Sequence, residues 1–358
     1  MKYALVGCGR ISPNHIVAAK NNNLNIVAIC DLDKSNMDDK VLKFDLGENV
    51  HLYSDYHKML ETERPELVGI ATESGKHAQI ALDCIDEGCH VIIEKPIALS
   101  IEDADKIIKR GREKNVKVCA CHQNRFNKSI QKIREAIEKK RFGKLLYGTA
   151  HIRWTRDYEY YSRAKWRGTW RQDGGALMNQ CIHDIDLLRW MMGNQIDEVI
   201  AMTDRLKHDY IEAEDLGIAL IKFSNGAYGI VEGTVNIYPK NLEETLYIFG
   251  EKGTVKAGGE AVNIIEEWNF SDYLDIADEI KKEFHEAPPN VYGFGHSRLY
   301  KDVIEAITYD REPYVNGEAG KQALELVLAI YKSAAGGGER IKFPLKSAST
   351  IDFEGRFD

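Results

Sequence analysis

The sequence predicts a two-domain α/β protein: a doubly wound parallel sheet over residues 1–121, followed by an α+β domain with an open, mostly antiparallel sheet over residues 122–358. Three observations predict this fold class. The length of 358 residues suits two domains of ordinary size. Short apolar runs alternate with helix-like segments in the first part of the chain. Longer apolar runs separated by turn signals fill most of the second part.

The strands expected in the first domain are rich in β-branched residues and do not alternate with polar residues. Runs such as IVAI and VII are typical of parallel strands that are buried on both faces. The expected strands are 2–6, 24–30, 67–70, 90–93 and 117–121, and the expected helices are 13–21, 34–46, 77–87 and 101–114. This strand–helix alternation predicts a doubly wound sheet.

The pattern changes after residue 122. A hairpin signal, Asn225-Gly226, separates two of the later apolar runs and favours antiparallel pairing. The expected strands are 146–154, 198–206, 214–223, 227–237, 244–250 and 341–344, and the expected helices are 130–140, 176–192, 294–308 and 318–335. The absence of a long linker predicts two domains that share an interface.

Composition excludes several classes of protein. The formal net charge is −8, and 44% of the residues are hydrophobic, so the chain can bury a core and is not disordered. An acidic chain is ill suited to nucleic acid, whose counterions must be displaced by a basic face. No apolar run approaches the roughly 18 residues of a membrane helix, and the first residues do not resemble a signal peptide. The seven cysteines lack metal-type spacing. We expect a cytoplasmic protein with reduced thiols, without a metal site and without a nucleic-acid or membrane partner.

A glycine-rich motif, GCGRIS, directly follows the first strand. Its first glycine permits a tight turn, and its second lets backbone amides approach a pyrophosphate at the start of the next helix. About twenty residues later, Asp31 ends the second strand, where a carboxylate accepts hydrogen bonds from ribose hydroxyls and repels a 2′-phosphate. The motif therefore favours NAD over NADP. The alternative interpretation is an ordinary strand–helix turn without a cofactor, in which Asp31 caps a helix. The expected cofactor contacts here are Gly7, Gly9, Arg10, Ile11 and Ser12.

Two further segments carry polar residues at positions where chemistry is expected. Lys95 lies in Glu-Lys-Pro at the end of the strand 90–93, and ligands of open α/β sheets bind at such strand ends. Asn179, His183 and Asp186 are spaced i, i+4 and i+7, which places them on one face of the expected helix 176–192. The alternatives are a solvated turn lysine and a histidine without function.

The segment 153–171, RWTRDYEYYSRAKWRGTWR, concentrates positive charge and aromatic rings in an otherwise acidic chain. Arginine binds phosphate or carboxylate through two hydrogen bonds, and aromatic rings stack on sugars and bases. The segment predicts a site for an anionic ligand, with a salt-bridged surface or a subunit interface as the alternative. Its basic residues are Arg153, Arg156, Arg163, Lys165, Arg167 and Arg171.

Taken together, these motifs resemble the Gfo/Idh/MocA family of NAD(P)-dependent sugar and inositol dehydrogenases. The resemblance rests on GCGRIS, IIEKPIALS, HQNRFNK at 122–128, WRGTW followed by DGGALMNQCIHDIDLLRW, and GHSRLYKDVIEAI near residue 295. It spans almost the whole chain. It implies an N-terminal Rossmann domain, and a homodimer or homotetramer formed through the outer face of the C-terminal sheet.

The resemblance also implies roles for individual residues. Lys95 is similar to the lysine that hydrogen-bonds the reacting hydroxyl, His183 to the catalytic histidine, and Asn179 stands where inositol dehydrogenases carry Asp. With Asn at this position, the sequence is similar to the nucleotide-sugar 3-dehydrogenases of the family. Further cofactor contacts implied are Thr72, His77, Glu94, Arg125, Trp166 and Arg167, and the implied substrate contacts are Lys95, Arg156, Tyr161, Asn179, His183 and His296.

The function expected from this resemblance is oxidation of a secondary hydroxyl, at C3, of a nucleotide-linked sugar. UDP-N-acetylglucosaminuronate or UDP-N-acetylglucosamine would be the substrate, with hydride transfer to NAD beside Lys95 and His183. Three alternatives stay open at this point: an inositol or free-sugar dehydrogenase, a glycosidase with tightly bound NAD, and a non-catalytic NAD-sensing protein. The presence of both Lys95 and His183 favours catalysis over sensing, because a sensor needs neither.

Overall fold

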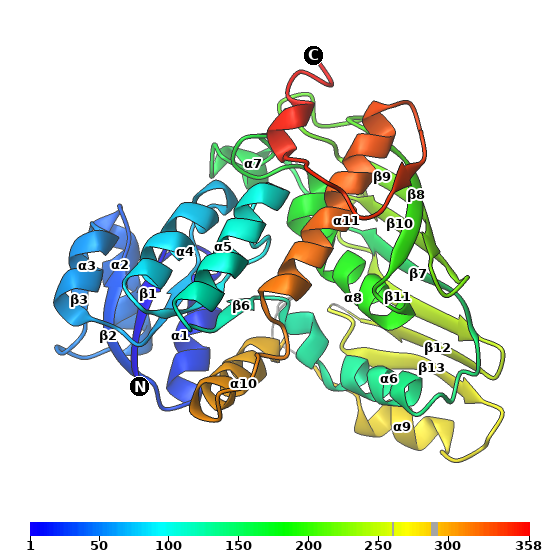
Figure 1. The fold of residues 1–358 in the computed structure, drawn as a ribbon, viewed down its shortest axis with the longest axis horizontal. Coiled ribbons are helices and arrows are strands. Elements are labelled where there is room, and N and C mark those ends of the chain that lie inside the picture. Colours follow the sequence, from blue (N-terminus) through cyan, green and yellow to red (C-terminus); the bar gives the residue numbers. More distant parts are fainter. Residues whose placement is uncertain (260, 288–292) are drawn as a thin grey trace. The chain divides into compact units, whose positions relative to one another are not determined.

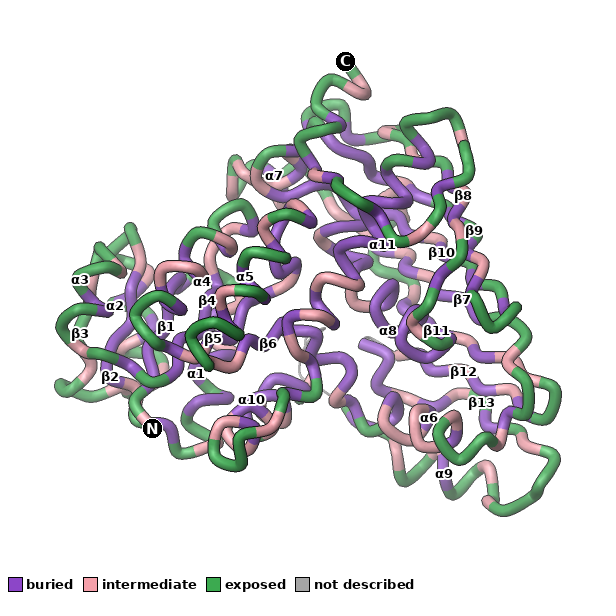
Figure 2. The backbone as a smooth tube through the Cα atoms, in the orientation of Figure 1, coloured by how far each residue is buried: buried purple, intermediate pink, exposed green. Residues whose placement is uncertain are grey.

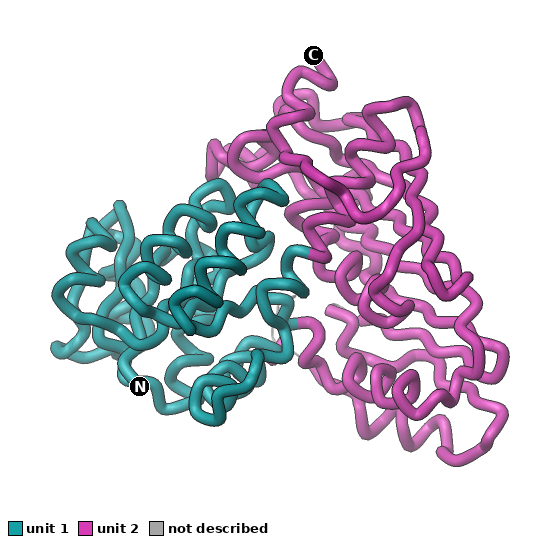
Figure 3. Tube along the Cα trace, in the orientation of Figure 1, with its two compact units in different colours: residues 1–123, 295–321 teal, residues 124–294, 322–358 magenta. Residues whose placement is uncertain are grey.

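The chain forms two compact units in a computed structural model that describes residues 1–259, 261–287 and 293–358. The first unit consists of Met1–Gln123 and Gly295–Lys321, and the second of Asn124–Phe294 and Gln322–Asp358 (Figure 3). These units differ from the division predicted at residues 121 and 122, because residues 295–321 return to the first unit. The compact units do not test the predicted roles of the two domains, cofactor binding for residues 1–121 and substrate binding for residues 122–358, so these roles stay a prediction.

The first unit is built on a six-stranded parallel sheet with the order β3-β2-β1-β4-β5-β6 (Figure 1). Its strands are β1 (Lys2–Val6), β2 (Asn25–Cys30), β3 (His51–Tyr53), β4 (Leu67–Ile70), β5 (His90–Ile93) and β6 (Val118–Ala120). Apart from β3, these are the strands expected from the sequence. The short strand β3 was not predicted, because it has no apolar run. Its side chains are exposed or half-buried. The predicted doubly wound parallel sheet is confirmed.

Helices flank the strands of this sheet. They are α1 (Ser12–Asn21), α2 (Lys34–Phe44), α3 (Tyr56–Glu63), α4 (His77–Asp86), α5 (Ile101–Glu113) and α10 (Gly295–Thr308). The side chains of Asp33 and Ser100 accept hydrogen bonds at the first turns of α2 and α5, which explains where these helices begin. The strands β1, β4 and β5 are almost wholly buried between the helices (Figure 2).

The second unit is built on an eight-stranded sheet with the order β13-β12-β11-β7-β10-β9-β8-β14. Its strands are β7 (Leu145–Arg153), β8 (Ile196–Asp204), β9 (Leu216–Phe223), β10 (Tyr228–Thr234), β11 (Glu243–Gly250), β12 (Gly253–Gly258), β13 (Ile264–Phe270) and β14 (Ile341–Lys342). Among the described strands, β7 and β10 pair in parallel and the remaining neighbours are antiparallel. The predicted open, mostly antiparallel sheet is confirmed, and β12 and β13 are additions to it.

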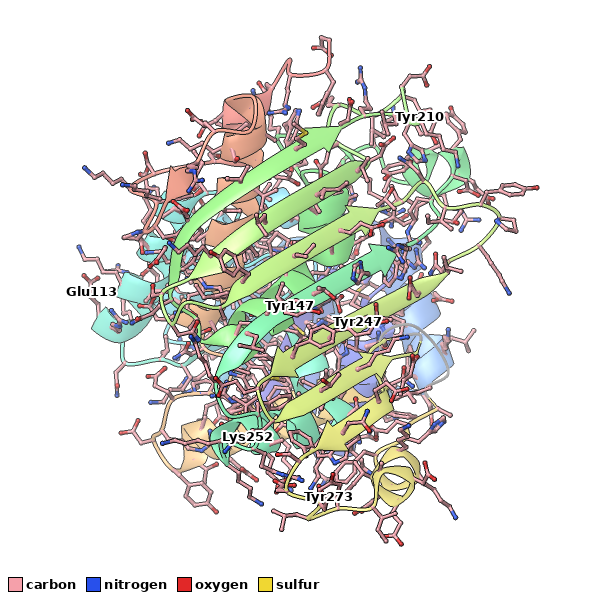
Figure 4. The ribbon with its side chains drawn as sticks, turned by 90° about the vertical axis from the view of Figure 1, so that its right-hand side faces the viewer. Glu113, Tyr147, Tyr210, Tyr247, Lys252 and Tyr273 are labelled. Carbon is pink, nitrogen blue, oxygen red and sulfur yellow. The ribbon has the colours of Figure 1, made fainter. Side chains whose placement is uncertain are left out.

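One face of this sheet is covered by helix α8 (Ile182–Met192), which packs on β7, β10 and β11. The remaining helices of the unit are α6 (Lys128–Glu138), α7 (Tyr158–Ser162), α9 (Ala277–Glu283) and most of α11 (Gly317–Ala335). The opposite face carries Tyr147 and Tyr247 (Figure 4). Exposed apolar side chains on the strands β7, β9 and β10 are Leu146, Tyr147, Ile218, Leu220, Tyr228 and Ile230.

All seven cysteines are buried and form no disulfide. Burial raises the pKa of several of these thiols, including Cys84 and Cys119, so they pack as small apolar side chains. Among the described residues, no helix combines the length and the apolar character that crossing a bilayer requires.

Candidate active site

The loop after β1 has the geometry of a pyrophosphate cradle. Gly7 has a φ of +95°, and a Cβ there would come within 2.5 Å of the Ala71 carbonyl. Gly9 has no atom within 4 Å of the corresponding position, and it is exposed, so a ligand can approach its backbone. The Ser12 hydroxyl donates to the Gly9 carbonyl over 2.7 Å and closes the loop at the first turn of α1. A serine therefore fits the third position of the motif.

Asp31 is fixed where it can select the ribose. One carboxylate oxygen accepts from the Cys8 amide over 2.7 Å, and the other accepts from the Asp33 amide over 2.8 Å. These bonds tie the end of β2 to the glycine-rich loop. The loop, the start of α1 and this carboxylate are the parts that bind NAD in a doubly wound domain, and the residues present fit that cofactor.

The end of β5 places Glu94 and Lys95 next to each other in different environments. Glu94 is buried, whereas Lys95 is half-buried. The ring nitrogens of His77 lie 2.7 Å from the Pro96 carbonyl oxygen and 3.1 Å from that of Thr72, so His77 links the ends of β4 and β5. Burial lowers the pKa of His77. In this structure the buried His77 therefore has a structural role, because it holds these two strand ends together.

The helix expected over 176–192 begins with a π-helical turn, Leu177–Cys181, followed by α8. π-Helical turns are rare and occur frequently at functional sites. From residue 173 to residue 192, Asn179 and His183 are the two side chains that are not buried. Both predicted catalytic residues of this segment are therefore accessible, on a helix that otherwise packs on all sides.

Asp186 departs from the prediction that it shares a face with Asn179 and His183. Its carboxylate is buried and accepts two hydrogen bonds from Arg125, at 2.6 and 2.7 Å. The Arg125 guanidinium lies 4.7 Å from the centre of the Trp190 ring. Through these contacts Arg125 holds α8 in place. They give no support to the cofactor role implied for Arg125.

Asn179 is held by side chains that the sequence did not single out. Its amide nitrogen donates to Asp173 over 2.5 Å, and its oxygen accepts from Gln180 over 3.1 Å. The Tyr160 hydroxyl lies 3.5 Å from the same oxygen and accepts from Gln180 over 3.0 Å. The buried carboxylate of Asp173 therefore orients the amide of Asn179. The sequence signal for Asp173 was its position directly before the glycine pair.

The basic segment divides into paired and unpaired arginines. Arg153 binds Glu232 and Glu243, Arg163 binds Glu159, and Arg171 binds Glu354. Among the described residues, no carboxylate partner is found for Arg156 or Arg167.

Arg156 and Arg167 instead flank the ring of Tyr160, with guanidinium carbons 5.0 and 4.4 Å from its centre. Arg156 also lies 4.8 Å from the Trp154 ring, and Arg167 lies 5.5 Å from the Trp166 ring. The segment is therefore in part a salt-bridged surface, the alternative given above. In part it is a stack of rings with two guanidinium groups that form no salt bridge among the described residues.

Two residues predicted to contact the substrate, Tyr161 and His296, are buried. Tyr161 is 6% exposed, and its ring packs against His208 and Tyr210. Its neighbour Tyr160 is the tyrosine that reaches Asn179. His296 is 3% exposed, and its Nε2 lies 3.3 Å from Glu94. Both residues are parts of buried clusters, so their predicted contact with substrate is not supported by these contacts.

Comparisons with known proteins give the chain a family. Residues 1–122 match a family model described as an oxidoreductase family with an NAD-binding Rossmann fold, and residues 130–256 match the GFO/IDH/MocA C-terminal domain. The chain is 25% identical to myo-inositol 2-dehydrogenase of Thermotoga maritima over 342 residues, which cover 93% of this chain and 96% of that protein.

Two solved structures are similar over nearly the whole chain. The WlbA dehydrogenase from Bordetella pertussis, in complex with NADH and UDP-GlcNAcA, is 40% identical, with a TM-score of 0.89 and coverage of 97% of this chain and 98% of that one. The WlbA dehydrogenase from Chromobacterium violaceum, with the same two ligands, is 36% identical, with a TM-score of 0.88 and coverage of 97% and 96%.

These matches confirm the predicted NAD cofactor and the predicted class of enzyme, an NAD-dependent sugar dehydrogenase. With the glycine-rich cradle, the two compact units and the accessible Asn179–His183 pair, they establish that the chain belongs to the Gfo/Idh/MocA family of oxidoreductases.

Proposed function

We propose that the chain oxidises the C3 hydroxyl of a nucleotide-linked sugar of the UDP-N-acetylglucosaminuronate type, with NAD as hydride acceptor. The observation that carries this proposal is the stack of Arg156, Tyr160 and Arg167, which presents two guanidinium groups without a carboxylate partner among the described residues. An anionic substrate would neutralise these charges, whereas inositol or a free neutral sugar would not. The two similar structures with UDP-GlcNAcA support the same substrate class.

The proposed chemistry divides the work between two side chains. When bound, NAD⁺ accepts the hydride, and the protein has to handle the hydroxyl proton. The imidazole of His183 accepts this proton, a role that suits a neutral imidazole. The ammonium of Lys95 hydrogen-bonds the same oxygen and stabilises the developing alkoxide. Asn179, oriented by Asp173, holds the sugar or the imidazole without adding charge.

The cofactor contacts proposed are those of the glycine-rich loop, Asp31 and Thr72, together with Trp166 and Arg167 over the nicotinamide. Trp166 and Arg167 are both half-buried, and their side chains lie next to each other. Arg167 therefore has two proposed partners, the nicotinamide and the anionic substrate. The activity of Arg167 variants with substrates of different charge separates these two contributions.

The proposal extends to an assembly of identical chains through the outer face of the eight-stranded sheet. On that face the apolar side chains alternate with buried ones along β9 and β10, and isolated monomers rarely expose such patches. Ile218→Lys and Ile230→Lys, made together, should convert a dimer or tetramer into monomers in light scattering coupled to gel filtration. Monomers in the unaltered protein would contradict the proposed assembly.

The substrate class is tested by single-turnover absorbance at the NADH band, with enzyme in excess so that internally recycled cofactor is also seen. We expect NADH with UDP-N-acetylglucosaminuronate or UDP-N-acetylglucosamine, and none with N-acetylglucosamine or myo-inositol. Lys95→Met and His183→Asn should each lower the hydride-transfer rate by at least about 100-fold while NADH still binds. Turnover of myo-inositol at the rate of the nucleotide sugars would refute the proposal.

The arginine stack provides a matched pair of variants. Arg167→Leu removes one of the two guanidinium groups of the stack and should raise the KM for the nucleotide sugar by about tenfold or more. Arg163→Leu removes a charge from the same segment, but there the guanidinium is exposed and paired with Glu159, so the kinetics should not change. Equal effects of the two substitutions would show that the segment acts only through its overall charge.

A further inference from the structure

The first unit contains a buried chain of hydrogen bonds that ends directly beside Lys95. The Tyr3 hydroxyl lies 2.7 Å from that of Tyr300, and the Tyr300 hydroxyl lies 2.7 Å from Nδ1 of His15. Nε2 of His15 lies 2.9 Å from Oε1 of Glu94, and Nε2 of His296 reaches the same oxygen at 3.3 Å. The other carboxylate oxygen of Glu94 accepts from the Lys95 amide over 3.1 Å.

The chain connects elements that are distant in sequence. His15 belongs to α1, which begins at the glycine-rich loop, and His296 and Tyr300 belong to α10. The helices α1 and α10 pack against each other, as Figure 1 shows. Glu94 follows β5. The bonds therefore join the helix of the cofactor cradle to the turn that carries Lys95.

The protons of the network can be assigned from the acceptors. A carboxylate only accepts, so both histidines donate from Nε2 to Glu94. Nδ1 of a neutral His15 then accepts from Tyr300, whose oxygen accepts from Tyr3. This assignment gives one proton to each of the four bonds. Burial alone would raise the pKa of Glu94, but the hydrogen bonds from the two histidines lower it well below its usual value.

The same residues invite a different interpretation as a metal site. The ligand atoms of His15, Glu94, Cys121 and His296 lie within 4.8 Å of one another. Ligands of a tetrahedral ion with bonds near 2.0 Å are about 3.3 Å apart. The separation of 2.9 Å between His15 and Glu94 is shorter than this and is an ordinary hydrogen-bond length. The geometry therefore favours a proton between these atoms over a shared metal ion.

We propose that His15, His296 and Glu94 form a buried clamp that positions Lys95 for the reaction by fixing the main chain at its amide. The clamp residues are positioning residues, since Glu94 touches the backbone of Lys95 and the histidines act through Glu94. This inference rests on the proposed function only in assigning the chemistry to Lys95. Because a misplacement of about 1 Å can cost about 100-fold in rate, loss of the clamp should lower turnover far more than it lowers NADH affinity.

Glu94→Gln is the variant that tests the clamp most directly. Its amide offers one acceptor and one donor group where the carboxylate offers two acceptors, so it cannot serve both the histidines and the Lys95 amide. We expect a fall in the hydride-transfer rate of about 100-fold, with the Kd for NADH changed by less than about threefold. In a Lys95→Met background the same substitution should have almost no further effect. An equal fall in both backgrounds would overturn the proposal, because Glu94 would then act independently of Lys95.

A substrate-independent measurement separates failure of the clamp from failure of the proposed function. Hydrogen exchange at the Lys95 amide should accelerate in Glu94→Gln and in His296→Leu, and His296→Gln, which can still donate, should recover part of the protection. Unchanged exchange in all of these variants would overturn the clamp even if the enzyme is active. Lost protection together with an inactive wild-type protein would refute only the proposed substrate.

Two controls complete the design. Glu63→Gln makes the same chemical change in a second histidine–carboxylate pair of the same unit, in which the exposed His51 lies 2.6 Å from Glu63, and it should leave turnover and Lys95 exchange unchanged. Elemental analysis of the purified protein by plasma mass spectrometry should find no stoichiometric metal. One bound metal ion per chain that is lost in Glu94→Gln would overturn the clamp in favour of a coordination site.

Discussion

Replacing Glu214 by Gln should remove a pH dependence from the stability of this protein. The Glu214 carboxyl is buried beside the π-helical turn, where Oε1 accepts from the Leu177 amide over 2.8 Å and from the Tyr331 hydroxyl over 3.0 Å. A Cβ on Gly175 would come within 1.7 Å of its other oxygen, so the space is tight. Burial, with a contribution from the neighbouring Asp215, raises the pKa of Glu214 to about 8. The group is therefore uncharged at neutral pH.

The magnitude follows from the difference between the two states. The ordinary pKa of 4.5 holds in the unfolded chain, so the proton is bound more tightly in the native state by about 3.5 pH units, or about 5 kcal/mol. This stabilisation is fully present below about pH 4.5. It then falls by about 1.4 kcal/mol per pH unit, because unfolding releases a proton, and it is lost above about pH 8.

Urea denaturation at about pH 5.5 and about pH 8 measures this effect. Glutamine has the shape of the protonated acid and does not titrate, so the wild-type protein should lose about 3 kcal/mol more than Glu214→Gln between these two pH values. Glu61→Gln, which changes an exposed carboxyl of α3, should follow the wild-type protein. Parallel pH dependence of wild-type and Glu214→Gln proteins would refute the burial of a neutral acid at this position.

Three further substitutions test other parts of the structure. Asn179→Asp places a second carboxylate 2.5 Å from Asp173, so turnover at pH 7 should fall by about tenfold or more and recover partly at lower pH in a pH–rate profile. Asp31→Ala removes the proposed acceptor for the ribose and the carboxylate that binds the Cys8 amide of the glycine-rich loop. Fluorescence titration should show NADH affinity falling by about tenfold while NADPH affinity changes less. Burial raises the pKa of Asp184 and of its neighbour Glu244 above their usual values. Glu244→Gln should therefore stabilise the protein at pH 8 more than at pH 5 in thermal unfolding.

The cofactor cradle could be predicted because its parts are consecutive or nearly so in the sequence. Gly7, Gly9 and Ser12 lie within six residues, and each has a local reason for its identity, from the positive φ of Gly7 to the bond that Ser12 makes with the Gly9 carbonyl. Most strands of the first sheet could also be predicted, because strands that are buried on both faces consist of continuous β-branched runs. Asp31 followed from its distance to the loop.

The helix that carries Asn179 and His183 could be predicted only in part. The i, i+4, i+7 spacing assumes a regular helix, whereas the π-helical turn changes the rotation between Asn179 and Asp186. Asp186 is therefore used by Arg125, a partner 61 residues away. Tyr160 and Tyr161 are neighbours in a five-residue helix, too short for periodicity to tell which one is buried.

The return of α10 to the first unit could not be inferred from local sequence. The contacts that hold it there are long-range, such as those of Tyr300 with His15 and Tyr3. Nothing in the local sequence around these histidine and tyrosine residues shows which distant side chains they contact. The contact of His296 with Glu94 could not be inferred for the same reason, since the two residues are 202 positions apart in the chain.

The most direct test of the central claim is the fate of a deuterium atom placed at C3 of UDP-N-acetylglucosaminuronate. In a single turnover with NAD⁺, we predict that the deuterium appears on C4 of the nicotinamide in the wild-type protein, and that over the same time it stays in the sugar in His183→Asn. Mass spectrometry of the recovered cofactor measures both outcomes. NADH without deuterium, or deuterium transfer that is undiminished in His183→Asn, would contradict the account.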